Sequence, residues 1–215
     1  MILALDTATD MPSFALGTPG DPGDDVRLAD RRALSREIER VVAALCAARG
    51  ATVRDLTAVL VADGPGSFTG LRIGAAFAKG LCRALGVPLL TAPSLLGAAA
   101  RAARAAGVAP PVEVRVRYDA LRGQCFGAAY RLEEGSVEVI EAPALAPIDA
   151  GPEPGKRGDL GATAAHASAA ALLGLVGLPG GPAAVADAGR WEPAYGRPAE
   201  AEAKRLAGER AAARA

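Results

Sequence analysis

The order of its apolar segments is the feature of this sequence that most restricts its fold. Ile2–Leu5 is an apolar run that ends at Asp6, and the similar runs Ser13–Leu16 and Val26–Leu28 follow across turn-rich stretches. This spacing predicts an antiparallel meander of strands. Helices and strands alternate after the meander, and the predicted elements are helix 34–49, strand 58–62, helix 70–85, strand 87–91 and helix 94–106.

The pattern changes at Val112, where a second strand-rich unit begins. Alternating apolar residues predict antiparallel strands over 112–119, 124–132 and 136–142. The remaining expected elements are a loop over 142–158, a helix over 162–175 and a terminal helix over 198–213.

A meander followed by alternating helices and strands is the order of a ribonuclease-H-like half, and the second strand-rich start indicates a degenerate copy. The predicted fold is therefore α/β, of the duplicated actin-like (ASKHA) kind, with a degenerate second half. We expect an N-terminal domain over 1–107, with its boundary near 107–111, and a smaller C-terminal domain over 108–215.

Five glycines surround the predicted start of the second helix, in VADGPGSFTGLRIGAAFAKG. A phosphate-binding P-loop needs Gly-Lys-Ser/Thr at its end, but Gly70 is followed by Leu71 and Arg72. A dinucleotide turn needs a third glycine where Thr69 stands. Both phosphate-binding interpretations are therefore poorly supported, and Gly64 with Gly66 is expected to shape a turn.

Small residues recur every four positions along this helix, at Gly70, Gly74 and Ala78. Such a seam allows a second helix to approach closely, and each interior glycine costs roughly 1 kcal/mol against alanine. Spacing alone leaves two hypotheses open: the seam packs on a partner's helix, which we favour, or on this protein's own sheet. Expected N-caps are Ser35 and Ser94 for the first and third helices, and Ser67 or Thr69 for the second.

Charge and rare residues exclude several classes of function. The 24 basic and 24 acidic residues cancel, so there is no strong electrostatic footprint for nucleic acid or anionic membrane. Cys46, Cys82 and Cys125 have no metal-ligand spacing and are expected to be buried thiols. The single histidine, His166, leaves no means of building a His-based metal site, and we expect it partly exposed on a helix. MILALDTATD does not fit a signal peptide, so a cytoplasmic location is expected.

The stretch GPGSFTGLRIG, followed by AKGL and GVP, resembles the signature of the TsaB (YeaZ-type) family. ILALDTAT, LSREIERVVAAL, PSLLGAAA, YDALRGQCFGAAY and EPAYGRPAEAE resemble further blocks of that family in the same order. Three departures stand out. Leu34 replaces a frequent histidine, Asp63 precedes the signature where an arginine or small residue is usual, and the second half is shortened between Ala142 and Asp159.

The resemblance implies a non-catalytic subunit with no cofactor or metal. It would pair with a catalytic TsaD-type subunit that transfers threonylcarbamoyl to the tRNA adenosine beside the anticodon, and a TsaE-type ATPase would join the pair. Contact with tRNA would occur only through the complex, without a membrane, and the resemblance allows a homodimer for the isolated chain. The family's interface lies on the first two helices, which here carry Ile38, Val41, Val42, Leu45, Gly70, Leu71, Gly74, Phe77 and Ala78. The signature loop consists of Gly64, Pro65, Gly66, Ser67, Phe68, Thr69 and Arg72.

An actin-like ATPase or small-molecule kinase is the alternative function. Asp6, Asp63 and Asp119 each stand at the end of a predicted strand, where carboxylates hold Mg²⁺ or activate water. Aspartate is also a common turn residue at strand ends. Arg72 raises a separate question, because a positive charge at a helix start opposes the macrodipole. We expect it to have a carboxylate partner or an interface role, unless it is a solvated side chain.

Overall fold

The computed structural model describes residues 1–148, 160–163 and 166–196. Its larger sheet has six strands in the order β10-β5-β4-β1-β2-β3. These strands are β1 (Ile2–Asp6), β2 (Ser13–Gly17), β3 (Val26–Arg27), β4 (Ala58–Ala62), β5 (Leu89–Ala92) and β10 (Ala183–Ala184). The predicted meander is confirmed, since β1, β2 and β3 pair antiparallel, whereas β4 runs parallel to both β1 and β5.

The second sheet has four strands in the order β8-β7-β6-β9. They are β6 (Val112–Leu121), β7 (Gln124–Leu132), β8 (Val137–Pro147) and β9 (Leu160–Thr163). The first three form the predicted antiparallel meander, and β9 runs parallel to β6. The order and directions of β8-β7-β6-β9 therefore repeat those of β3-β2-β1-β4 in the larger sheet.

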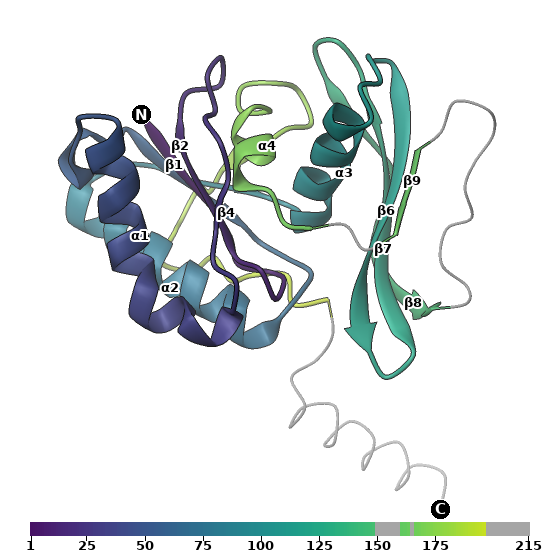
Figure 1. Cartoon of the computed structure of the whole chain (residues 1–215), viewed down its shortest axis with the longest axis horizontal. Helices are drawn as coiled ribbons and strands as arrows, with labels where there is room; N and C mark the ends of the chain where they lie inside the picture. The colour runs from purple at the N-terminus through teal and green to yellow at the C-terminus, as the bar shows by residue number, and fades with distance from the viewer. Residues whose placement is uncertain (149–159, 164–165, 197–215) are drawn as a thin grey trace, which may run out of the picture.

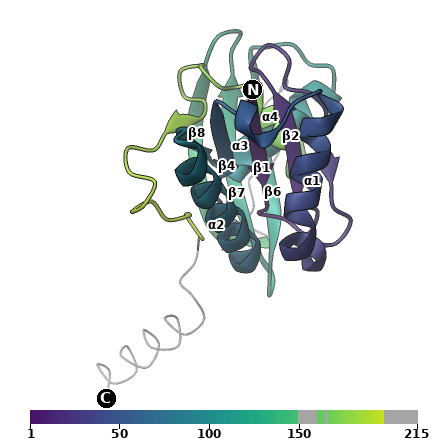
Figure 2. The same cartoon turned by 90° about the vertical axis from the view of Figure 1, so that its left-hand side faces the viewer.

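Helices α1 (Leu34–Ala48) and α2 (Phe68–Leu85) lie side by side on one face of the larger sheet (Figure 2). Helices α3 (Ser94–Ala105) and α4 (Ala169–Leu173) lie between the two sheets (Figure 1). Two short 3₁₀ turns, Arg31–Ala33 and Val53–Asp55, flank α1. The chain thus forms a mixed α/β structure with helices on both faces of a mixed sheet.

Two apolar clusters fill the spaces between these layers. Alternate residues of β1 divide between them because successive side chains of a strand point to opposite faces. Leu3 and Leu5 face α1 and α2, whereas Ala4 faces α3, α4 and the second sheet. Both faces of β1 are therefore covered, and Leu3, Ala4 and Leu5 are fully buried.

Three expectations for the helices need correction. Ser35 does not cap α1, because the chain enters that helix through the 3₁₀ turn, whose own cap is Asp30. Ser94 does not cap α3 with its side chain either, since its hydroxyl donates to Pro65 O at 2.8 Å. The helix expected over 162–175 is only α4, because Leu160–Thr163 pairs with β6 as β9.

Other differences concern the second half of the chain. β8 continues to Pro147, into the expected loop, because it pairs with β7 as far as Gln124. His166, expected partly exposed on a helix, is exposed and precedes α4. The helix expected over 198–213 lies outside the described residues. α4 and β10 both belong to the C-terminal part of the sequence, yet α4 packs on β1 and β2 and β10 pairs with β5.

Candidate functional site

The signature loop connects β4 to α2 and begins that helix. Ser67 is its N-cap, since Ser67 Oγ accepts a hydrogen bond from Gly70 N–H at 3.2 Å. Arg31 Nη1 also donates to Ser67 Oγ, at 2.7 Å. Of the two caps expected from the sequence, the structure selects Ser67 and leaves Thr69 exposed. At its other end α2 stops at Gly86, whose φ of 70° is left-handed.

Replacing Ser67 by alanine is expected to lower the free energy of unfolding by about 1 to 2 kcal/mol, because the helix loses its cap and Arg31 loses a partner. Urea unfolding measures this change. Thr69→Ala is the matched control, since Thr69 is exposed in the same turn and should change stability by less than about 0.5 kcal/mol. Equal effects of the two substitutions would contradict the assignment of Ser67 as the cap.

The glycines around the loop allow it to lie against the segment that follows β1. A Cβ added at Gly66 would lie 2.4 Å from Ala8 O, and one added at Gly70 would lie 2.1 Å from Thr7 O. The N–H of Ser67 donates to Ala8 O at 2.7 Å. Because the N–H groups of Ser67 and Gly70 are both taken by partners within the chain, they are not free to hold a phosphate.

The same loop joins parts of the chain that are distant in sequence. Ser94 N–H donates to Gly64 O at 2.9 Å, and Tyr118 Oη donates to Ser94 O at 2.9 Å. Ala194 N–H donates to Asp63 O at 2.7 Å. The loop is therefore a junction between the larger sheet, α3, the second sheet and the segment that follows β10.

The small-residue seam of α2 packs on the protein's own sheet, which corrects our preference for a partner's helix. Gly70, Gly74 and Ala78 are all buried. A Cβ added at Gly74 would lie 2.4 Å from Thr7 Oγ1, so the helix approaches the end of β1 closely there. Ala78 is fully buried in the cluster beneath α1 and α2. The seam serves an intramolecular helix-to-sheet contact.

Most of the other residues expected at the interface are also core residues in this chain. Ile38, Val41, Val42 and Leu71 have exposed fractions of 4%, 6%, 1% and 1%. Leu45 and Phe77 are partly exposed. Val42 and Leu71 are too deeply buried to contact another protein directly. Direct contact therefore remains a proposal for Leu45 and Phe77.

An aromatic cluster lies at the start of α2, and the sequence identified only part of it. Phe68 is 40% exposed, and its ring centroid lies 4.6 Å from that of Tyr195. The guanidinium carbon of Arg72 lies 5.2 Å from the Phe68 centroid, which is a cation–π contact. Within the described residues, Arg72 forms no ion pair with a carboxylate within 4.0 Å. Tyr195 escaped prediction because it is distant in sequence.

The three strand-end aspartates have different environments. Asp6 is completely buried, and loss of hydration raises its pKa from 3.8 to about 7. Its Oδ1 accepts from Ala8 N–H at 3.1 Å, whereas its Oδ2 has no hydrogen-bond partner among the described residues. Asp63 ends the neighbouring strand, and burial raises its pKa to about 6. Asp119 is exposed and accepts from Leu121 N–H at 2.7 Å, as a turn residue does.

The described residues contain neither a metal-binding cluster nor a membrane-spanning helix. In the part of the chain that the structure describes, no three His, Cys, Asp or Glu side chains are grouped to hold a metal ion. Over the same residues, no helix combines the length and the apolar character that a membrane crossing requires.

The chain is similar to proteins of known family. Residues 28–154 match the family model described as TsaD: tRNA N6-adenosine threonylcarbamoyltransferase. The tRNA threonylcarbamoyladenosine biosynthesis protein TsaB of Escherichia coli is 33% identical over 136 residues, which is 63% of this chain and 57% of that protein. TsaB of Bacillus subtilis is 37% identical over 87 residues, or 40% of this chain and 36% of that protein. The matches thus span about a third to just over half of these relatives.

A solved structure extends the similarity to nearly the whole chain. It is a Pseudomonas aeruginosa protein described as uncharacterized, with similarity to peptidase YeaZ. The two structures have a TM-score of 0.76 at 25% sequence identity, over 91% of this chain and 99% of that one. The mixed α/β architecture of two sheets is therefore like that of this YeaZ-like protein.

Proposed function

Because this chain belongs to the TsaB (YeaZ-type) family, we propose that it takes part in forming threonylcarbamoyladenosine on tRNA. In this proposal it is a non-catalytic subunit. It pairs with a TsaD-type subunit that carries out the transfer, and a TsaE-type ATPase joins the pair. Contact with tRNA arises only in the complex, and the protein works in the cytoplasm.

The solvent-facing side of α2 is the observation that most supports pairing. Ala76, Gly80 and Ala84 recur every four residues on this side and are all exposed. A Cβ added at Gly80 would meet no atom within 4 Å. A partner's helix has room to approach the α2 backbone closely here. α1 lies alongside and widens the same face (Figure 2).

Apolar and aromatic side chains accompany this small-residue surface. Leu45 of α1 and Phe77 of α2 are partly exposed. Phe68, Tyr195 and Arg72 form the aromatic cluster at the start of α2. Aromatic residues and arginine are the types that most often dominate the energy of protein interfaces. We therefore propose an interface made by the outer side of α2, these two apolar residues and the aromatic cluster.

The strand-end aspartates favour the non-catalytic role over an ATPase or kinase. Asp6 has no exposed surface, and its raised pKa keeps its carboxyl largely protonated below pH 7. A buried, protonated carboxyl is a poor ligand for Mg²⁺, which prefers charged oxygen ligands and retains several waters. The Asp119 carboxylate, near the end of β6, already accepts a hydrogen bond from Leu121 N–H. Magnesium-dependent ATP hydrolysis that disappears in Asp6→Asn would contradict this part of the proposal.

We propose further that the fold is a duplication with a degenerate second half. The repeated strand order β3-β2-β1-β4 and β8-β7-β6-β9 supports this origin. The division into domains 1–107 and 108–215 follows the two meanders, although β10 of the second part completes the first sheet.

Ala76→Arg is expected to weaken binding to a catalytic TsaD-type subunit at least about tenfold, because a long charged side chain would stand where two helices meet. Co-purification and a titration of the purified subunits measure the effect. Ala142→Arg is the matched control, since Ala142 is exposed on the second sheet. Normal binding by a folded Ala76→Arg protein would contradict the proposed interface. If the isolated chain is a homodimer through the same face, this substitution should also make it monomeric in gel filtration.

A further inference from the structure

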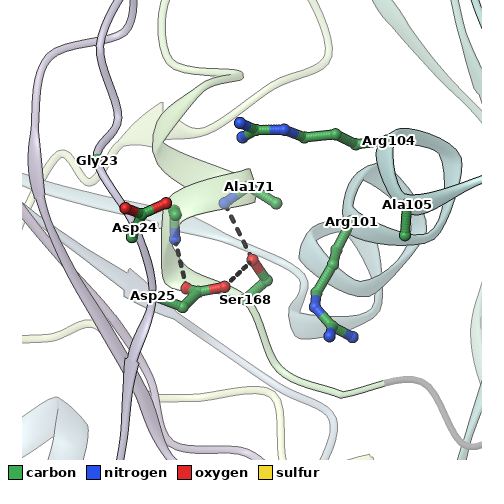
Figure 3. A pocket seen from close by; sticks show the side chains of 9 residues that line it. Gly23, Asp24, Asp25, Arg101, Arg104, Ala105, Ser168 and Ala171 are labelled. Atoms are coloured by element: carbon green, nitrogen blue, oxygen red, sulfur yellow. Dashed lines mark hydrogen bonds between the residues drawn. The ribbon is translucent and has the colours of Figure 1, made fainter. Parts of the chain in front are cut away.

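A surface cavity of about 340 Å³ lies on the opposite side of the larger sheet from α1 and α2. One wall is acidic and carries Asp24 and Asp25, from the segment between β2 and β3. The other wall is basic and carries Arg101 and Arg104, from the last turns of α3. Figure 3 shows Arg104 extending from α3 toward the side of the cavity that carries Asp24.

Asp25 is fully used in holding the fold together. Its carboxylate accepts hydrogen bonds from Ser13 Oγ at 2.5 Å, from Ser168 Oγ at 2.7 Å and from Ala170 N–H at 2.9 Å. Arg27 pairs with it at 2.6 Å. Because its oxygens already have these partners, Asp25 serves to fix one wall of the cavity rather than to bind a ligand.

The backbone at the start of α4 is used in the same way. Three of its N–H groups donate to side-chain oxygens. Ala169 N–H donates to Ser13, Ala170 N–H to Asp25 and Ala171 N–H to Ser168. An anion in the cavity would therefore find no free N–H there. The other residues that line the cavity are small and uncharged, so the charges left for a ligand are those of Asp24, Arg101 and Arg104.

These three charged residues line one cavity, and no ion pair joins them. Among the described residues, none of the three forms an ion pair within 4.0 Å. Asp24 and Arg104 are exposed, and Arg101 is partly buried. A ligand with a single charge would be attracted by one wall and repelled by the other. A ligand with both charges would match both walls.

We propose that this cavity binds a small zwitterion of the amino-acid class. Arg104 holds its carboxylate, since the planar guanidinium donates paired hydrogen bonds to a carboxylate, and Arg101 adds positive charge to the same wall. Asp24 accepts hydrogen bonds from its ammonium group. The volume lies within the range of small-molecule sites. This binding does not depend on the partner role proposed above, because the two surfaces lie on different helices.

Titration with a graded series of zwitterions tests the proposal. Glycine, β-alanine, 4-aminobutyrate and 5-aminopentanoate carry the same two charges at increasing separation, and acetate and methylamine carry one charge each. We expect saturable binding of at least one zwitterion to the full chain. The NMR shifts of the arginine side-chain N–H signals measure this binding. Acetate and methylamine should bind at least about tenfold more weakly.

Substitutions locate the binding. Arg104→Gln and Asp24→Asn should each weaken the best zwitterion at least about tenfold, with an unchanged melting temperature. Arg36→Gln is the control, because Arg36 is an exposed arginine of α1 on the other side of the sheet. The proposal is overturned if no zwitterion saturates at roughly 10 mM, tenfold above a millimolar Kd. It is equally overturned if acetate binds as well as the zwitterions, or if both cavity variants bind like the unchanged protein.

Discussion

Gly70→Ala is expected to lower the free energy of unfolding by about 2 kcal/mol, although alanine is the better helix former. The added Cβ would lie 2.1 Å from Thr7 O, which is a backbone atom at the end of β1. Because the Cβ would meet a backbone atom, no flexible side chain can turn away to relieve the contact. Either α2 must shift off the sheet or the segment after β1 must move, and Ala8 O would then lose its bond from Ser67 N–H. Denaturant unfolding measures the change.

Gly80→Ala is the matched control for this prediction. Gly80 lies in the same helix, is exposed, and has open space where its Cβ would be. The same substitution should therefore raise stability, by up to about 1 kcal/mol, through helix propensity alone. The opposite signs of the two changes distinguish the buried side of α2 from its open side. A Gly70→Ala protein as stable as Gly80→Ala would contradict the packing of the seam on β1.

Asp6→Asn is expected to remove most of the loss of stability that the protein shows between pH 4 and pH 8, and so to flatten its pH profile. The pKa of Asp6 is about 7 in the folded chain against an ordinary value of 3.8, chiefly because burial removes hydration from the charged form. The nearby carboxylates of Asp25 and Asp63 act in the same direction. Asparagine keeps an oxygen that accepts from Ala8 N–H and never has to be ionised.

The sign of the pH effect follows from the raised pKa. Below pH 3.8 Asp6 is protonated in both states, and its contribution to stability is fully present. As the pH rises toward 7, the unfolded chain loses this proton while the folded chain keeps it, so stability falls. At about 1.4 kcal/mol per pKa unit the total loss is about 4 kcal/mol and is complete above pH 7.

Urea unfolding between pH 4 and pH 8 measures this difference. Asp63, whose pKa is about 6, adds a smaller loss of the same sign that remains in the Asp6→Asn protein. Asp119→Asn is the control, because it makes the same chemical change at an exposed position near the end of β6 and should preserve the original profile. If Asp6→Asn and the unchanged protein lose stability in parallel over this range, Asp6 does not titrate as described.

The strands β1 to β5 were predictable because each is a short apolar run between turn residues. Ala58–Ala62 agrees with the prediction at both ends, and β5 differs only by a shift of one to two residues. The helix expected over 162–175 failed for a tertiary reason. Alanine favours a helix throughout that segment, but pairing with β6 draws Leu160–Thr163 into a strand, and α4 begins only at the Ser168 cap.

The face of α2 that meets the sheet could not be predicted, because small residues line both sides of this helix. Gly70, Gly74 and Ala78 form one four-residue repeat, and Ala76, Gly80 and Ala84 form another. Spacing treats the two sets alike, and only the position of Thr7 after β1 shows which is buried. The environment of Asp6 was equally hidden, since a strand-end aspartate has the same sequence pattern whether it is exposed or buried.

The bond from Ala194 N–H to Asp63 O has a consequence for the order in which the protein is made. A ribosome releases residues 1–107 long before Ala194 leaves the exit tunnel. During that interval Asp63 O lacks this donor, β5 lacks the β10 pairing, and Phe68 lacks the ring of Tyr195. The nascent first half therefore exposes an unpaired strand edge and an uncovered aromatic ring, both of which favour association with other chains. The window closes only when the chain as far as Tyr195 has left the exit tunnel and packed on the first half.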